Sequence, residues 1–148
     1  MPFRHLPPRG AAPPEPRVIL PEGGSRALRV LVADDNSDAL LMLAMLLRSF
    51  GHEVKTAFDG AIALEQAAEL APDVALLDLD MPVKSGFEVA RALRGDTTHA
   101  GVVLVAISGK AEPEDRAQAS RAGFDHHLAK PADVEQLLRI LETAAARR

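Results

Sequence analysis

The sequence predicts one α/β domain, in which a parallel sheet carries helices on both faces. Short apolar runs alternate with longer amphipathic segments from residue 27 onward, and each run lies between helical patterns, as buried parallel strands do. Asp, Ser and Lys residues stand directly after four of these runs. In open α/β sheets, ligands bind at the carboxyl ends of the strands, so the same pattern also predicts where the functional site lies.

Apolar periodicity predicts five strand–helix units, which imply a parallel sheet covered on both sides. We expect strands at 28–33, 53–57, 73–77, 102–107 and 125–128. We expect helices at 37–50, 60–70, 84–94, 112–122 and 132–145.

Residues at the expected helix boundaries support these assignments. Gly51 and Gly123 stand where helix C-caps are expected, and Asp59 where an N-cap is expected. Pro113 and Pro131 fall at helix starts, where a missing N–H group is harmless. No G-x-G-x-x-G motif follows the first strand, which argues against a dinucleotide-binding fold.

The first 26 residues differ in composition from the rest of the chain. Seven of the 11 prolines lie between Pro2 and Pro21. This density predicts a disordered extension over 1–26, followed by a compact domain over 27–148. A proline-rich ligand for a partner domain is the alternative interpretation of the extension.

Composition and charge argue against several classes of protein. The chain has 148 residues, 47% of them hydrophobic, which is enough for a true core. Its net charge of -4, without a basic stripe, predicts no nucleic-acid partner. No apolar run approaches membrane length, and the N-terminus lacks the apolar stretch of a signal peptide. The absence of cysteine excludes disulfides and fits a cytoplasmic location.

Three aspartates form the strongest chemical signal. Asp34 and Asp35 follow the first apolar run, and Asp78 follows the third. If these strands are neighbours, three carboxylates converge at one edge of the sheet. Such a cluster repels itself unless a hard cation is bound, and Mg²⁺ prefers a few carboxylates plus water.

A serine and a lysine complete the set at the strand ends. Ser108 ends the fourth apolar run, and Lys130 follows the fifth. Each residue alone has an ordinary explanation as a cap or a solvated loop side chain. Together they favour phosphoryl chemistry, because a carboxylate can accept a phosphoryl group while a metal and a lysine neutralise its charge.

Four segments carry a resemblance to a known family: VLVADDNSDAL, VALLDLDMPVKSGFEVA, VVLVAISGK and AGFDHHLAKP. Over about residues 27–145 the chain resembles the receiver (response regulator) domain of two-component signal transduction systems. The resemblance implies a flavodoxin-like doubly wound sheet of five parallel strands in the order 2-1-3-4-5. That order makes the strand before Asp34 a neighbour of the strand that ends near Asp78.

The resemblance also implies roles for the acidic residues. Asp78 would be the phosphoacceptor and a ligand of Mg²⁺. Asp35 would bind the metal directly, Asp34 through water, and Asp80 through its backbone carbonyl.

The resemblance implies that Ser108 follows the phosphoryl group and that Lys130 pairs first with Asp78 and then with the phosphate. The bond between Lys130 and Pro131 is typically cis in this family. One position departs from the pattern, because His127 stands where Tyr or Phe is usual. With Ser108 it forms the predicted switch. An imidazole is smaller than the usual ring and belongs to a side-chain type that can titrate near neutral pH.

The first helix carries more apolar residues than one core face needs. Its spacing predicts a core face made of Ala39, Met42, Leu43, Leu46, Leu47 and Phe50. The remaining residues Leu40, Leu41 and Met45 would then form a docking surface for a kinase's helical bundle. Incidental surface hydrophobes or a homodimer are the alternatives.

We expect a stand-alone receiver without an output domain, which is no enzyme and signals by a conformational switch. A histidine kinase or histidine phosphotransfer protein would donate the phosphoryl group, and the chain would be a monomer or weak homodimer without a membrane partner. A receiver fragment of a hybrid histidine kinase is one alternative. A haloacid-dehalogenase-like phosphatase is a remote one, because Asp78-Leu79-Asp80 resembles its nucleophile motif. The intact acidic and lysine set argues against a third, a pseudo-receiver scaffold.

Overall fold

The computed structural model describes residues 27–109 and 112–147, so the predicted extension over 1–26 lies outside the described residues. Five strands and five α-helices alternate there, with one short 3-10 helix, η1 (Thr97–His99). The strands are β1 (Arg29–Ala33), β2 (Glu53–Ala57), β3 (Val74–Asp78), β4 (Val103–Ser108) and β5 (His126–Ala129). The helices are α1 (Ser37–Ser49), α2 (Gly60–Leu70), α3 (Gly86–Arg94), α4 (Pro113–Ala122) and α5 (Val134–Ala146).

The five strands form one parallel sheet in the order β2-β1-β3-β4-β5, which confirms the predicted topology. Ala33 on β1 lies opposite Leu77 on β3, and Asp78 lies opposite Ile107 on β4. The residues that follow these strands therefore leave the sheet at the same edge. Among the described residues, the helices are all too short or too polar to cross a membrane.

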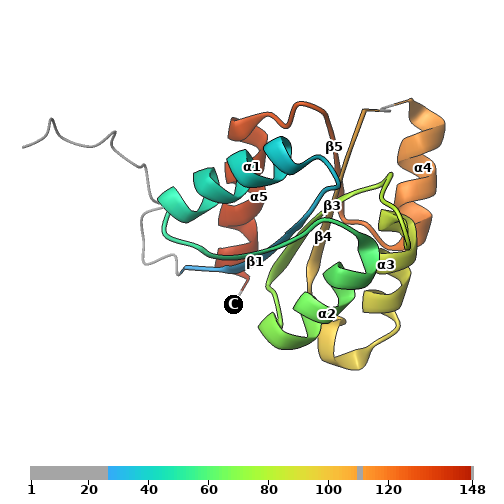
Figure 1. The fold of residues 1–148 in the computed structure, drawn as a ribbon, viewed down its shortest axis with the longest axis horizontal. Helices are drawn as coiled ribbons and strands as arrows, with labels where there is room; N and C mark the ends of the chain where they lie inside the picture. The colour runs from blue at the N-terminus through green and yellow to red at the C-terminus, as the bar shows by residue number, and fades with distance from the viewer. Residues whose placement is uncertain (1–26, 110–111, 148) are drawn as a thin grey trace, which may run out of the picture.

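Helices α1 and α5 cover one face of the sheet, and α2, α3 and α4 cover the other (Figure 1). Alternate residues of the central strands serve the two cores, as the period of two requires. Val30, Val32, Leu76 and Val105 pack toward α1 and α5, whereas Leu31, Leu77, Leu104 and Ala106 pack toward the other three helices.

Several predicted helix boundaries are confirmed. Gly51 and Gly123 follow α1 and α4 with φ of 94° and 107°, a region that favours glycine. The Asp59 side chain caps α2 by accepting a hydrogen bond of 2.8 Å from Ile62 N. The prediction for Pro131 is wrong, because α5 begins only at Val134, where the side chain of the preceding Asp133 caps it. The Lys130–Pro131 peptide bond is cis.

The orientation of α1 differs from the prediction. Leu40, Ala44 and Leu47 face the core, and Leu40 is only 6% exposed. Met42, predicted to be buried, is 71% exposed. Leu40 therefore cannot belong to an outer docking surface. The error has a physical reason: the run from Ala39 to Leu47 contains no polar residue that would fix which side faces water.

Arg94, the last residue of α3, holds the end of the sheet opposite to the site, where β4 and β5 begin. Its guanidinium donates to the carbonyl oxygens of Ala100 (3.1 Å), Val102 (2.6 Å) and Gly123 (2.9 Å). It also forms an ion pair of 2.5 Å with Asp125. One side chain thus joins α3, the approach to β4 and the turn before β5.

Candidate functional site

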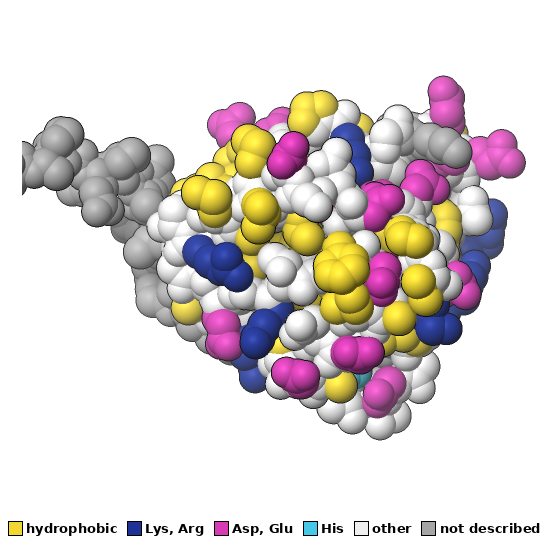
Figure 2. Space-filling model, viewed as in Figure 1, with side chains coloured by type: hydrophobic (Ala, Val, Ile, Leu, Met, Phe, Trp, Pro, Cys, Tyr) yellow, Lys and Arg dark blue, Asp and Glu magenta, His cyan; other side chains and the backbone are white. Residues whose placement is uncertain are grey.

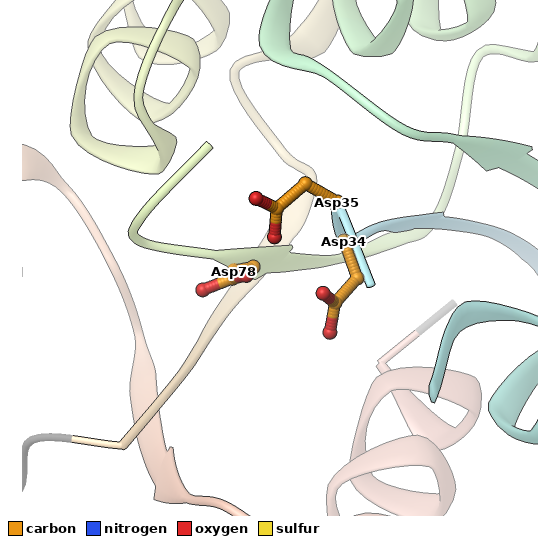
Figure 3. A group of neighbouring side chains, drawn as sticks. All are labelled: Asp34, Asp35 and Asp78. Atoms are coloured by element: carbon orange, nitrogen blue, oxygen red, sulfur yellow. The ribbon is translucent and has the colours of Figure 1, made fainter. Parts of the chain in front are cut away.

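Three carboxylates gather where β1 and β3 end (Figure 3). Asp34 and Asp35 directly follow β1, and Asp78 is the last residue of β3. One oxygen of each lies within 4.8 Å of the others. Asp34 and Asp78 are buried, whereas Asp35 is exposed. The adjacency of β1 and β3 thus brings together the three carboxylates among the four predicted metal ligands.

Lys130 is the cation that faces these carboxylates. Its Nζ lies 3.2 Å from Oδ2 of Asp34 and 3.2 Å from Oδ2 of Asp78. The lysine backbone is fixed by a hydrogen bond of 2.8 Å from Lys130 N to Ser108 O. Burial opposes the positive charge, but hydrogen bonds and attraction to Asp78 and Asp34 outweigh it, so the pKa of Lys130 is raised. The sequence predicted the contact with Asp78 but not the one with Asp34.

Backbone N–H groups orient both buried carboxylates. Asp34 Oδ1 accepts a hydrogen bond of 2.9 Å from Asn36 N, and Asp78 Oδ1 accepts one of 3.1 Å from Asp80 N. In each case the other oxygen faces Lys130. Asp80 therefore contributes a backbone donor to the site, and its own side chain is exposed.

The cluster carries more negative charge than its surroundings balance. Burial raises the pKa of Asp78 to about 6, and repulsion from Asp34 adds to that effect. The hydrogen bonds from Asp80 and Lys130 act in the opposite direction without cancelling it. A set of carboxylate oxygens that is short of positive charge matches the preference of Mg²⁺ for hard oxygen ligands. Asp34, Asp35 and Asp78 therefore fit a magnesium ion.

Ser108 and His127 meet on the other side of Asp78. Ser108 ends β4, next to β3, and is 1% exposed. Its Oγ lies 3.0 Å from Nε2 of His127 on β5. The His127 carbonyl accepts a hydrogen bond of 3.4 Å from Nη1 of Arg116 on α4. The sequence predicted that these two residues form the switch. It did not predict the contact between them, which depends on side-chain rotamers.

An apolar groove of about 830 Å³ leads from the outer side of α1 to the carboxylates. Met42, Met45 and Ala132 are among its lining residues, and Asp34 and Lys130 also line it. Hydrophobic side chains gather over α1 on this face of the molecule (Figure 2). The exposed residues Leu41, Met42 and Met45, here named the α1 stripe, replace the set predicted from sequence.

The sequence profile of the response regulator receiver domain matches residues 30–142, about three quarters of the chain. The chain belongs to this family. Receiver domains are signalling domains of two-component systems, and they interact with histidine kinases or phosphotransfer proteins. They bind Mg²⁺ at an acidic site.

The related proteins fall into two groups, one about as long as a receiver domain and one about twice as long. Protein PilH of Pseudomonas aeruginosa is 30% identical over 118 residues, which cover 80% of this chain and 98% of PilH. Transcriptional regulatory protein PrrA of Mycobacterium leprae is 40% identical over 125 residues, which cover 84% of this chain and 53% of that protein. This receiver thus spans about half the length of relatives such as PrrA, and its predicted lack of a nucleic-acid partner stays a prediction.

Solved receiver structures share the fold. The chemotaxis response regulator CheY4 of Vibrio cholerae is 31% identical with a TM-score of 0.74, and the match covers 80% of this chain and 99% of that one. The receiver domain of a sensor histidine kinase of Pseudomonas aeruginosa PAO1 is 29% identical with a TM-score of 0.74. That match covers 82% of this chain and 99% of the other, which holds a magnesium ion in its active-site cleft.

Proposed function

We propose that this receiver accepts a phosphoryl group on Asp78 from a phosphohistidine of a histidine kinase or phosphotransfer protein, in a Mg²⁺-dependent reaction. The observation that carries the proposal is the position of Asp78. It is a buried carboxylate with two more carboxylates within 4.8 Å and the Lys130 ammonium at 3.2 Å. Asp34 has the same neighbours. Asp78 differs from Asp34 in ending β3, the strand next to β4, which carries Ser108.

In the proposed reaction a carboxylate oxygen of Asp78 attacks phosphorus, and the bond from phosphorus to the imidazole nitrogen breaks. The electron pair of that bond stays on the imidazole, which takes up a proton. Asp34, Asp35, Asp78 and the Asp80 carbonyl would hold Mg²⁺, which neutralises charge on the phosphoryl oxygens when it is bound.

The side chains around Asp78 would stabilise the product. Lys130 would exchange a carboxylate contact for a phosphoryl oxygen, and the Ser108 hydroxyl would donate to another. A metal-free pKa of about 6 leaves Asp78 mostly ionised at neutral pH, as a nucleophile must be.

Labelling by a small phosphodonor tests the acceptor. Wild type incubated with acetyl phosphate and Mg²⁺ should gain one phosphoryl group in intact-mass spectra, and Asp78→Asn should gain none. Asp80→Asn is the matched control, because Asp80 is an exposed carboxylate two residues away and should be labelled like wild type. Equal labelling of wild type and Asp78→Asn would reject the assignment.

We also propose that the donor's helical bundle docks on the α1 stripe. The groove beside the stripe is lined at one end by Asp34 and Lys130, so a helix lying there would bring its phosphohistidine close to Asp78. Burial of the stripe would contribute about 25 cal/mol per Å² of apolar surface removed from water.

A further inference from the structure

The hydroxyl that the proposed function assigns to a phosphoryl oxygen is already engaged in this structure. Ser108 Oγ and His127 Nε2 lie 3.0 Å apart, within hydrogen-bonding distance. Ser108 is 1% exposed and His127 is half-buried, so the bond is shielded from water that would otherwise compete for it.

The two residues stand on neighbouring strands at the same edge of the sheet. Ala106 on β4 lies opposite His127 on β5, and Ser108 lies opposite Ala129. Asp78 lies opposite Ile107 on the other side of β4. Ser108 thus stands between the phosphoacceptor strand and the histidine strand, with partners available on both sides.

A serine hydroxyl has one proton to donate. When Nε2 of a neutral His127 accepts that proton, it is not available to a phosphoryl oxygen. When Nε2 instead carries a proton and donates to Oγ, the hydroxyl oxygen is still held toward β5. In the first arrangement Ser108 must break its hydrogen bond to His127 before it can donate to a phosphoryl oxygen on Asp78, and the inference rests on that arrangement.

We infer that His127 is a positioning residue that restrains Ser108 and thereby opposes formation of the phosphorylated state. This inference rests on the proposed function of Ser108 and Asp78. Aromatic rings without a hydrogen-bonding edge could not restrain the hydroxyl in this way, so the restraint follows from the histidine of this chain.

Beryllofluoride, a phosphoryl mimic, tests the inference without a kinase. In saturating Mg²⁺, His127→Leu should bind beryllofluoride about fivefold more tightly than wild type, which corresponds to a lost hydrogen bond of about 1 kcal/mol. His127→Gln should stay close to wild type, because a glutamine amide can replace Nε2. His126→Leu is the matched control: this exposed neighbour on the same strand should leave the affinity unchanged.

A double-mutant cycle separates restraint of Ser108 from a general effect on folding. Ser108→Ala should weaken beryllofluoride binding, and adding His127→Leu to it should change nothing further. Thermal unfolding of each variant shows whether it is folded. If His127→Leu has the same effect with and without Ser108, or no effect with Ser108 present, the inference is wrong. Failure of wild type to bind beryllofluoride would instead contradict the proposed function, and the inference with it.

Discussion

The two halves of the site differ in charge and in what surrounds them. The half at β1 and β3 holds three carboxylates against the single ammonium of Lys130, and α1 beside it exposes an apolar stripe. The half at β4 and β5 holds an uncharged hydroxyl bonded to an imidazole. Beside it lies α4, whose buried residues are only Ala119 and Ala122 and whose outer surface is polar.

The two halves are therefore expected to respond to phosphorylation in different ways. The acidic half lacks positive charge, as the raised pKa of Asp78 indicates, so it is completed by adding a cation and a phosphoryl group. The hydroxyl half already has its hydrogen bond, so it responds only by rearranging. The predictions below separate the two halves.

The largest expected effect is on metal binding. Asp35→Ala should lower Mg²⁺ affinity by more than about 100-fold, since even residues behind metal ligands cost about 10- to 100-fold. Asp35 is exposed, so its removal should not disturb folding. Ser108→Ala should leave the affinity unchanged. Titration of Mg²⁺ by calorimetry or NMR checks both, and equal losses in both variants would contradict the division into halves.

The second effect concerns stability and pH in metal-free buffer. Asp78 has a folded-state pKa of about 6, above its ordinary 3.8, so the folded protein holds this proton more tightly than the unfolded chain does. Binding of this proton therefore adds to the unfolding free energy. The added stability is complete below pH about 4 and is lost as pH rises past about 6. Relative to Asp78→Asn, wild type should lose up to about 3 kcal/mol of unfolding free energy over that range.

Chemical denaturation of both proteins at several pH values measures this difference. The difference in unfolding free energy between wild type and Ser108→Ala should not change with pH, because a serine hydroxyl does not titrate in this range. Added Mg²⁺ should restore wild-type stability at pH 8 and leave Asp78→Asn less affected. A constant difference between wild type and Asp78→Asn at all pH values would show that burial does not penalise the Asp78 charge.

The smallest expected effect lies on the flanking helices. Leu41→Lys with Met45→Lys should slow transfer from a cognate kinase about tenfold, since loss of central apolar contacts costs about 1–2 kcal/mol. Labelling by acetyl phosphate should be unchanged. Ala117→Lys with Gln118→Lys adds the same two positive charges to the exposed surface of α4 and should not slow transfer. If only self-association changes, the α1 stripe is a dimer surface instead.

The sequence predicted the sheet and its helices to within two residues at every boundary. That success rests on local signals: apolar runs of strand length and turn residues such as Gly51 and Asp59. The orientation of α1 was wrong because Leu40 and Met42 carry no signal that tells a core residue from a surface one. Packing against β1 and β2 decides it, and the sequence does not contain that geometry locally.

The site residues were predictable because they follow apolar strands whose order the resemblance supplied. The contacts between these side chains were less predictable. The pairing of Lys130 with Asp34, and of Ser108 with His127, depends on rotamers that several strands determine together. Arg94 was missed altogether, since an arginine in the last turn of a helix usually points into water.

The contact between Arg94 and Gly123 limits the order in which substitutions can accumulate in this chain. Two features disfavour any other residue at position 123. The φ of Gly123 is 107°, and an added Cβ would lie 2.6 Å from Cγ of Arg94. Shortening residue 94 removes the second barrier but also releases the carbonyls that the guanidinium holds. A lineage that replaces Gly123 therefore has to change position 94 first, and the weakened fold in between makes that route hard to follow.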